Sequence, residues 1–344
     1  MTAKAYFVLY ANCIPVKGAT RSVICDLQLN RYQPIPNSLY EVLTDHAGKT
    51  IEATKQYYEY QHDEVIDEYF EFLIEEEYGF VTNKADWFDP IEVTWDAPGL
   101  VTNMIVDCIH LWDHDWQILL PQIEKLGTPD LQIRHYGPGS IEDLRGFLQL
   151  TATSRIKSIE IIIGAHASLT TEALTSLQSF GRLRSLTVHS SPADEVVYLG
   201  NTGFGNIYRV RQKIDGPHHC GIIQPLYFMV NMESFMEART HNSCLNRKLS
   251  IDASGDICNC PSMPDRYGNI KDTKLQTALK SPGFTDTWGI IKDKISTCKD
   301  CEFRYICSDC RAYTEEDQRY GKPAKCSYNP YTGCYDDEIE KASP

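Results

Sequence analysis

Cysteines concentrate in the C-terminal third of the chain. Ten of the thirteen cysteines lie within the last 130 of its 344 residues. A spacing of two residues lets one tight turn bring two thiolates to the same metal ion or cluster. The pattern therefore predicts a metal-binding module in this part of the chain. Seven cysteines follow this pattern of short spacings: Cys244, Cys260, Cys298, Cys301, Cys307, Cys310 and Cys326.

Disulfide bonds are the main alternative use for these cysteines. They belong to oxidising compartments and to small chains, whereas a chain of 344 residues can bury an adequate core without them. The apolar run at the N-terminus is short and contains two tyrosines, so we expect a β-strand there and no signal peptide. No apolar stretch reaches the length of a membrane span. We therefore expect a cytoplasmic protein, away from membranes, whose cysteines bind metal.

The overall charge narrows the class of ligand. A formal net charge of −14 argues against a nucleic-acid-binding protein, which needs a basic surface to displace counterions from phosphates. With 42% hydrophobic and 23% charged residues, the composition is that of an ordered globular protein. The chain length predicts two or three domains.

Residues 1–84 have the pattern of a small α+β domain. Segments 6–13 and 21–29 are rich in β-branched and aromatic residues, and the Pro and Gly between them favour a hairpin. Asn37 is expected to cap a short helix, and a longer amphipathic helix follows over residues 65–73. This layout is winged-helix-like. Because its helices are acidic, we expect it to bind the leader region of a peptide, by strand addition, in preference to DNA.

Residues 85–235 alternate between strand and helix patterns, which predicts βαβ units and a mostly parallel sheet. The number of strands is too small for a closed eight-stranded barrel, so we expect an open sheet, or a degenerate partial (β/α) barrel. The predicted strands cover residues 91–95, 131–135, 156–163, 183–189 and 207–211, and the predicted helices cover residues 116–126, 141–150 and 171–180.

Residues 236–344 form the cysteine-rich module and show little periodicity. Residues 248–258 are expected to form a hairpin with its turn at residues 252–255. Irregular backbone of this kind is usually organised by its metals. Loss of the metal is therefore expected to unfold this region first.

The cysteine pattern resembles a known domain. The spacing Cys-x10-Gly-x4-Cys from Cys244 to Cys260, followed by Cys-x2-Cys-x5-Cys-x2-Cys from Cys298 to Cys310, resembles the SPASM domain. That domain binds auxiliary iron–sulfur clusters in many radical S-adenosylmethionine peptide-modifying enzymes. The residues around these cysteines, and the segment Ile14-Pro-Val-Lys-Gly18, are similar to the SPASM-domain peptide maturases of the grasp-with-spasm systems. The resemblance extends over nearly the whole chain.

The resemblance implies two 4Fe-4S clusters and a set of ligands for each. The fourth ligand of the first cluster is open between Cys220 and Cys258. The gap from Cys307 to Cys310 is two residues, where three are usual in the family. The first cluster would take Cys244, Cys260, Cys310 and, by our preference, Cys220; the second would take Cys298, Cys301, Cys307 and Cys326.

One motif of the radical enzymes is missing. They hold the cluster that cleaves S-adenosylmethionine with Cys-x3-Cys-x2-Cys after the first barrel strand. The corresponding stretch, which we place at residues 95–103, contains no cysteine, and the nearest is the isolated Cys108. One thiolate does not retain a cluster that needs three. The sequence therefore argues against S-adenosylmethionine as a cofactor and leaves open whether the chain is an enzyme.

Three functions are compatible with these features. The first is a peptide maturation factor that binds a precursor peptide and acts with an ATP-grasp ligase, since the chain has no glycine-rich phosphate loop of its own. The second is an autonomous iron–sulfur enzyme that modifies the peptide. The third is a zinc-stabilised scaffold, because tetrathiolate zinc tolerates the same spacings.

Overall fold

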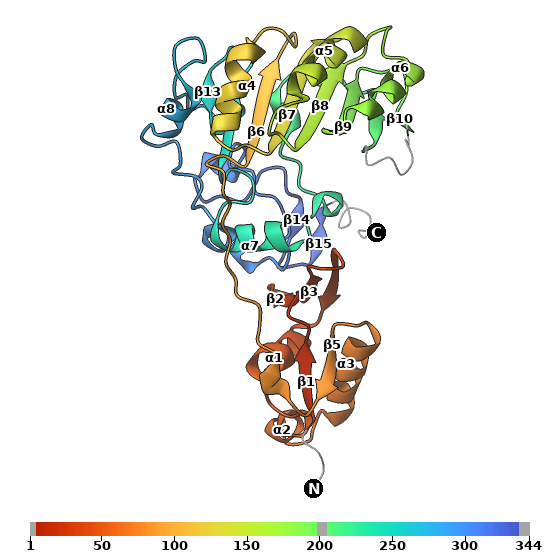
Figure 1. Ribbon diagram of the computed structural model, residues 1–344. Coiled ribbons are helices and arrows are strands. Elements are labelled where there is room, and N and C mark those ends of the chain that lie inside the picture. The colour runs from red at the N-terminus through yellow and green to blue at the C-terminus, as the bar shows by residue number, and fades with distance from the viewer. Residues whose placement is uncertain (1–4, 198–204, 337–344) are drawn as a thin grey trace. The chain divides into compact units, whose positions relative to one another are not determined.

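The chain folds into two compact units, each assembled from segments that are separate in the sequence. The computed structural model describes residues 5–197 and 205–336 (Figure 1). The first unit contains Met1–Trp95, Ile223–Ser243 and Ile290–Pro344. The second unit contains Asp96–Ile222 and Cys244–Gly289. The predicted domain boundaries at residues 84 and 235 stay predictions.

The N-terminal part of the first unit combines three helices with a strand pair. Strand β1 (Tyr6–Leu9) pairs antiparallel with β5 (Gly79–Thr82). Between them in the sequence lie α1 (Asn37–Asp45), α2 (Ile51–Tyr57) and α3 (Asp63–Glu75). The pattern predicted over residues 65–73 is confirmed as helix. These elements suit a winged-helix-like domain, and assignment to that class stays a prediction.

A three-stranded antiparallel sheet completes this part of the unit. It contains β2 (Cys13–Val16), β3 (Ser22–Asp26) and β4 (Arg31–Ile35), with β3 in the middle. The prediction of one strand over residues 6–13 is wrong, because the chain turns after Tyr10, whose carbonyl accepts the amide of Cys13 at 2.8 Å. The hairpin therefore forms between β2 and β3, while β1 pairs elsewhere.

The expected cap of the first helix is also wrong. Pro36 occupies the N-cap position of α1, and no side chain caps the helix. The Asn37 side chain instead accepts a hydrogen bond from the Ser22 hydroxyl at 2.7 Å. The Asn37 side chain therefore bonds to β3 and does not cap the helix as the local sequence predicted.

The rest of the first unit is mostly irregular. It contains α7 (Met232–Thr240) and the strand pair β14 (Tyr328–Asn329) and β15 (Cys334–Tyr335). Most of residues 290–336 are turns and short 3-10 helices. The 3-10 helices of the whole chain are Ala85–Trp87, Ser176–Ser179, Pro217–His219, Pro225–Tyr227, Lys292–Lys294, Cys298–Asp300 and Glu315–Asp317.

The second unit is built on one mixed sheet. Its strand order is β10-β11-β9-β8-β7-β6-β12-β13. The strands from β11 to β12 in this order are all parallel, and an antiparallel strand flanks them at each edge. The predicted open, mostly parallel sheet is thus confirmed. The strands are β6 (Asn103–Cys108), β7 (Asp130–Pro138), β8 (Ser158–Gly164), β9 (Leu183–His189), β10 (Glu195–Val197), β11 (Ile207–Arg209), β12 (Lys248–Ile251) and β13 (Ile257–Cys258).

Three helices cover one face of this sheet (Figure 1). Helices α4 (Trp116–Lys125), α5 (Ile141–Thr151) and α6 (Thr171–Thr175) connect strands β6 to β9 in turn. Alternate strand residues, such as Ile159 and Ile161, are buried in the core with these helices, whereas Glu160 between them is exposed. The face opposite the helices therefore carries polar side chains.

The segment at residues 91–95 is not a strand. Ile91, Val93 and Trp95 pack against an apolar cluster of the first unit, so their alternation reflects burial and not strand pairing. The first parallel strand is instead β6, whose sequence includes Asn, Asp and Cys. The predicted hairpin at residues 248–258 is confirmed, with Gly255 in its turn at φ +87°. Its first strand, β12, also joins the parallel sheet beside β6.

The remaining helix of the second unit, α8 (Leu275–Leu279), contacts α4. No helix in residues 5–197 and 205–336 has both the length and the apolar character of a membrane span.

Candidate functional site

Four cysteines of the first unit influence one another electrostatically. We call Cys298, Cys301, Cys307 and Cys326 the four-cysteine group. Cys298 and Cys307 are buried, and Cys301 and Cys326 are half-buried. Burial raises the pKa of Cys298 to about 12, and the Cys307 and Cys326 thiols add to the rise. The Cys298 thiol therefore stays protonated near neutral pH unless a metal displaces the proton.

A lysine lies against the four-cysteine group. Lys292 is only 4% exposed, and its ammonium group donates to the Cys307 sulfur at 3.0 Å and to the Ser308 carbonyl at 2.9 Å. Burial would lower the pKa of Lys292, but the neighbouring Cys307 and Cys298 outweigh it and the pKa is raised. A buried ammonium is costly unless negative charge lies close by. The donor set therefore fits a metal centre that keeps its thiols as thiolates.

The second unit holds a similar arrangement. We call Cys220, Cys244 and Cys260 the three-cysteine group. The Lys248 ammonium lies 3.4 Å from the Cys244 sulfur. Against the effect of burial, all three thiols raise the pKa of Lys248. Burial raises the pKa of Cys260 to about 11, and Cys244 adds to the rise. Thiols on either side of the β12–β13 hairpin and a third thiol from a distant loop thus act on the same ammonium group.

The structure separates the two candidates for the fourth ligand. Cys258 is fully buried on β13, where its thiol donates to the Ser250 carbonyl at 3.6 Å. Cys220 is exposed and is among the main contributors to the raised pKa of Lys248. Cys310 belongs to the first unit. The complete ligand assignment stays a prediction.

A polar network lies on the face of the sheet opposite the helices, near the carboxyl ends of β6 and β7. The Asp107 carboxylate accepts two hydrogen bonds from Arg134, at 2.6 and 2.9 Å, and one from the Tyr136 hydroxyl at 2.7 Å. All three side chains are buried. Burial raises the pKa of Asp107 although Arg134 opposes the rise. Cys220 also contributes to the raised pKa of Arg134. Ligands of open parallel sheets bind at this edge.

The loop after the first parallel strand differs in position from the prediction. Because the strand is β6, this loop covers residues 109–115 and not residues 95–103. It contains no cysteine, and Cys108 before it is fully buried. The relocated loop therefore also lacks the three-cysteine motif. Its His114 instead forms a hydrogen bond with the Asp107 backbone carbonyl at 2.8 Å.

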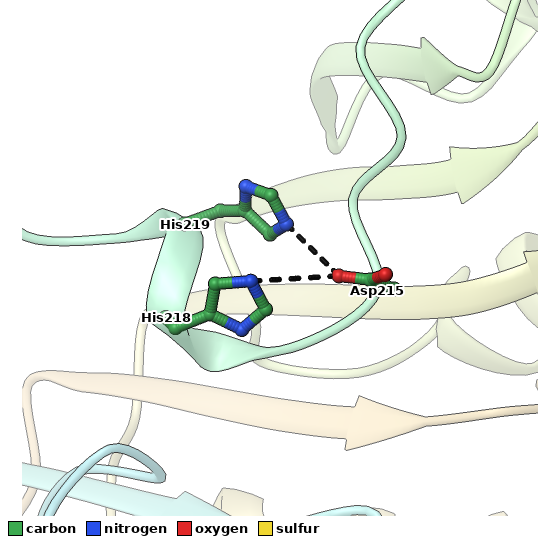
Figure 2. A group of neighbouring side chains, drawn as sticks. All are labelled: Asp215, His218 and His219. Atoms are coloured by element: carbon green, nitrogen blue, oxygen red, sulfur yellow. Dashed lines mark hydrogen bonds and ion pairs between the residues drawn. The ribbon is translucent and has the colours of Figure 1, made fainter.

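One compact group of potential metal ligands was not predicted. Asp215, His218 and His219, which we call the Asp–His–His cluster, lie in the loop after β11 (Figure 2). Among the described residues, they are the one group of three or more such side chains with ligand atoms all within 4.8 Å of one another. The motif Asp-x2-His-His ahead of Cys220 is the sequence signal that could have revealed it.

The first unit contains an apolar cavity of about 540 Å³. Strand β1, the end of α1 and residues 85–93 contribute to its lining. Two of its aromatic residues, Tyr10 and Phe88, are 42% and 47% exposed, and the Phe80 ring lies between them at 5.5 and 4.8 Å. His46, Lys49 and Arg239 add basic groups to the lining. The cavity therefore offers an apolar site with exposed aromatic residues at its border.

Comparison with known proteins gives few matches. No protein-family model matches the chain, and no curated protein matches it. Among solved structures, Streptococcus suis SuiB bound to S-adenosylmethionine aligns with a TM-score of 0.42 and 10% identity, over 94% of this chain and 100% of SuiB. SuiB bound to its precursor peptide SuiA gives a TM-score of 0.41 and 10% identity, over 95% and 99%. An identity of 10% with TM-scores below 0.5 carries no argument about function. The proposed function therefore rests on the residues of this chain.

Proposed function

We propose that this chain is a maturation factor for a ribosomally made peptide, which binds the precursor peptide in its first unit. The apolar cavity with its exposed aromatic residues is the observation that carries this proposal. Peptide-binding sites combine apolar pockets with exposed strand edges, so that side chains enter pockets while the peptide backbone pairs with a strand. Such a site binds an extended leader segment.

The strand pair β1–β5 provides the edges. Along the described residues, β1 pairs on one side with β5, and its only other sheet contact is an isolated bridge from Tyr6 to Thr50. Strand β5 has β1 as its only partner in this sheet. An added peptide strand would extend this small sheet, and apolar side chains of the peptide would enter the cavity. Lys49 and Arg239 would pair with acidic groups of the leader.

Two metal centres would organise the rest of the protein. The four-cysteine group would hold one 4Fe-4S cluster, and the three-cysteine group would provide ligands to the other. Zinc is the alternative metal, because tetrathiolate zinc tolerates the same spacings. Iron–sulfur clusters would in addition supply electron transfer.

An ATP-grasp ligase is the proposed partner, as the sequence resemblance implies. The chain lacks a glycine-rich phosphate loop, so the activation of carboxylates by ATP would come from this ligase. The present chain would hold the precursor peptide while the ligase acts on its other end.

Peptide binding can be tested with the full chain. The probe is a synthetic candidate precursor peptide, labelled with a fluorophore and followed by anisotropy. Replacing Tyr10 or Phe88 with Ala should weaken binding about tenfold or more, because an aromatic anchor contributes about 1.4 kcal/mol or more. Tyr227, which is 52% exposed and does not line the cavity, provides the control substitution Y227A. Equal affinity in all four proteins would contradict binding at the cavity.

An autonomous iron–sulfur enzyme is the second candidate. The buried polar network supports it, because Cys220 lies close enough to influence Arg134. A cluster at the three-cysteine group would then adjoin a charged site at the carboxyl edge of the sheet. Incubation of the purified chain with precursor and reductant, without the ligase, tests this candidate by mass spectrometry. An unchanged peptide mass and an unchanged crosslinking pattern would rule out this activity.

A further inference from the structure

We propose that the Asp–His–His cluster binds one divalent metal ion of the zinc class, as a site separate from the cysteine groups. The proposal does not depend on the proposed function. Imidazole nitrogens suit zinc, cobalt, nickel and iron, whereas magnesium and calcium prefer oxygen ligands alone. Two imidazoles and one carboxylate therefore select a transition metal.

The ligand atoms already have the spacing that a metal needs. The Nε2 atoms of His219 and His218 lie 3.0 and 3.5 Å from the same oxygen, Oδ1 of Asp215 (Figure 2). At metal–ligand distances of about 2.0–2.1 Å, ligands of a tetrahedral ion are about 3.3 Å apart. The observed distances lie on either side of this value. The three ligand atoms all lie within 4.8 Å of one another, so side-chain shifts can place one ion among them.

A glycine leaves space for one of the imidazoles. Neighbouring side chains usually point in different directions, but the 3-10 turn Pro217–His219 brings both rings to Asp215, with their centroids 4.1 Å apart. A Cβ atom on Gly216 would lie only 3.0 Å from Nδ1 of His218. A Cβ atom there would require the His218 ring to shift by a few tenths of an ångström. Gly216 therefore lets this ring approach the backbone closely.

The loop is held before the cluster and within it. Before the cluster, the Gln212 carbonyl accepts the amide of Ser190, which directly follows β9, at 3.0 Å. Within the cluster, the Ser262 hydroxyl donates to the Pro217 carbonyl at 3.1 Å. These contacts hold the cluster at the carboxyl edge of the parallel sheet, where ligand sites of such sheets form. The cluster therefore has a fixed position and needs little ordering on binding.

The surrounding side chains suit metal ligation. Gln212 lies 3.1 Å from Nδ1 of His219, and a half-turn of its amide lets its oxygen accept the Nδ1 hydrogen when Nε2 binds metal. The Lys213 ammonium lies 3.4 Å from Oδ2 of Asp215, so the other oxygen, Oδ1, faces the imidazoles. The side chains of His218 and Asp215 are 61% and 46% exposed. The remaining coordination positions are therefore accessible to water or to a donor group of a ligand.

Cobalt(II) is the probe, because its visible spectrum distinguishes nitrogen and oxygen ligands from thiolates. The full-length protein, with its iron–sulfur clusters reconstituted without oxygen, is titrated with Co²⁺ by calorimetry and by difference absorption. We expect one ion per chain with weak d–d bands and no new thiolate charge-transfer band. The double variant H218A/H219A should lose this ion, with an affinity at least about a hundredfold weaker. The variants D215N and G216A should each weaken binding about tenfold.

His166 supplies the matched control. It is an exposed histidine of the same unit outside the cluster, so the variant H166A should bind Co²⁺ as the natural chain does. Circular dichroism checks that each variant folds. The proposal is overturned if the natural chain binds no Co²⁺, or if H218A/H219A retains its affinity. It is equally overturned if binding shows a thiolate band that is lost with C220S, since the ion would then belong to the cysteines.

Discussion

Each of the two cysteine groups lies against a lysine of its own, but the two groups differ in what surrounds them. The four-cysteine group lies in an irregular segment, with Lys292 fully buried and 3.0 Å from the Cys307 sulfur. The three-cysteine group borders a regular sheet, with Lys248 partly exposed and 3.4 Å from the Cys244 sulfur. Cys220 of this group is exposed. We infer that the first group mainly stabilises the fold, while the second is accessible to a ligand.

The core of each region explains this difference. Cys307 belongs to an apolar cluster with Phe303, Tyr305 and Ile306, residues that form no regular element. The second unit has a large core of sheet and helix side chains that contains no member of the three-cysteine group. Irregular segments depend on their metals for folding, whereas a sheet with packed helices does not.

The largest expected effect is the loss of folding stability when one cysteine of either group is replaced. Cys298→Ser should destabilise the protein by about 3–5 kcal/mol, because loss of the cluster leaves the Lys292 charge buried without compensation. Cys260→Ser should cost less than half as much, since its surroundings keep their own core. Cys334 lies outside both groups and provides the control C334S. Anaerobic thermal unfolding measures the loss of stability in each variant. Equal losses for C298S and C260S would contradict the different roles of the two groups.

Replacing each lysine tests the same difference between the two cysteine groups by removing one charge at a time. Lys292→Met should destabilise the cluster-loaded protein by about 2–3 kcal/mol, because hydrogen bonds to charged groups contribute about 1.5–3 kcal/mol. Lys248→Met should cost less, since the residue is partly exposed and its ammonium lies further from its sulfur. Both substitutions should also make cluster reduction harder, with a larger shift for K292M.

The potentials are measured by anaerobic titration with optical detection. Lys299→Met is the control, because this exposed lysine follows Cys298 directly and makes no hydrogen bond to a sulfur atom that the structure shows. A larger shift for K248M than for K292M would reverse the proposed roles of the two groups.

A smaller effect is expected at the polar network. Tyr136→Phe removes one hydrogen bond to the Asp107 carboxylate and should cost about 1–2 kcal/mol. The control is Y208F on β11, where the tyrosine is 37% exposed. Urea unfolding measures both. A loss no greater than that of Y208F would mean that Arg134 alone satisfies Asp107.

Much of the fold followed from local pattern, and the exceptions have physical causes. The segment at residues 183–189 was predicted as a strand in an alternation of strand-like and helix-like segments, and it coincides with β9. Strand β6 was not predicted, since the sequence NMIVDC lacks a clean alternation and only its neighbours β7 and β12 make it a strand. Residues 91–95 alternate for the opposite reason, because they pack against a core without pairing.

The candidate sites also contain residues that the sequence predicted and residues that it did not. Short spacings identified the cysteines, because two-residue gaps restrict where a chain can place its sulfurs. Lys292 and Lys248 could not be predicted, since a lysine in sequence does not reveal which sulfur its side chain reaches. The cation that balances each group is a property of the tertiary fold.

The central claim is that the cysteines hold two iron–sulfur clusters. The most direct test is to purify the protein without oxygen and to measure iron, acid-labile sulfide and zinc per chain beside the visible spectrum. The account predicts about eight irons and eight sulfides, as two 4Fe-4S clusters require, and about four of each in C298S and in C260S. Stoichiometric zinc without sulfide, or neither metal, would contradict it.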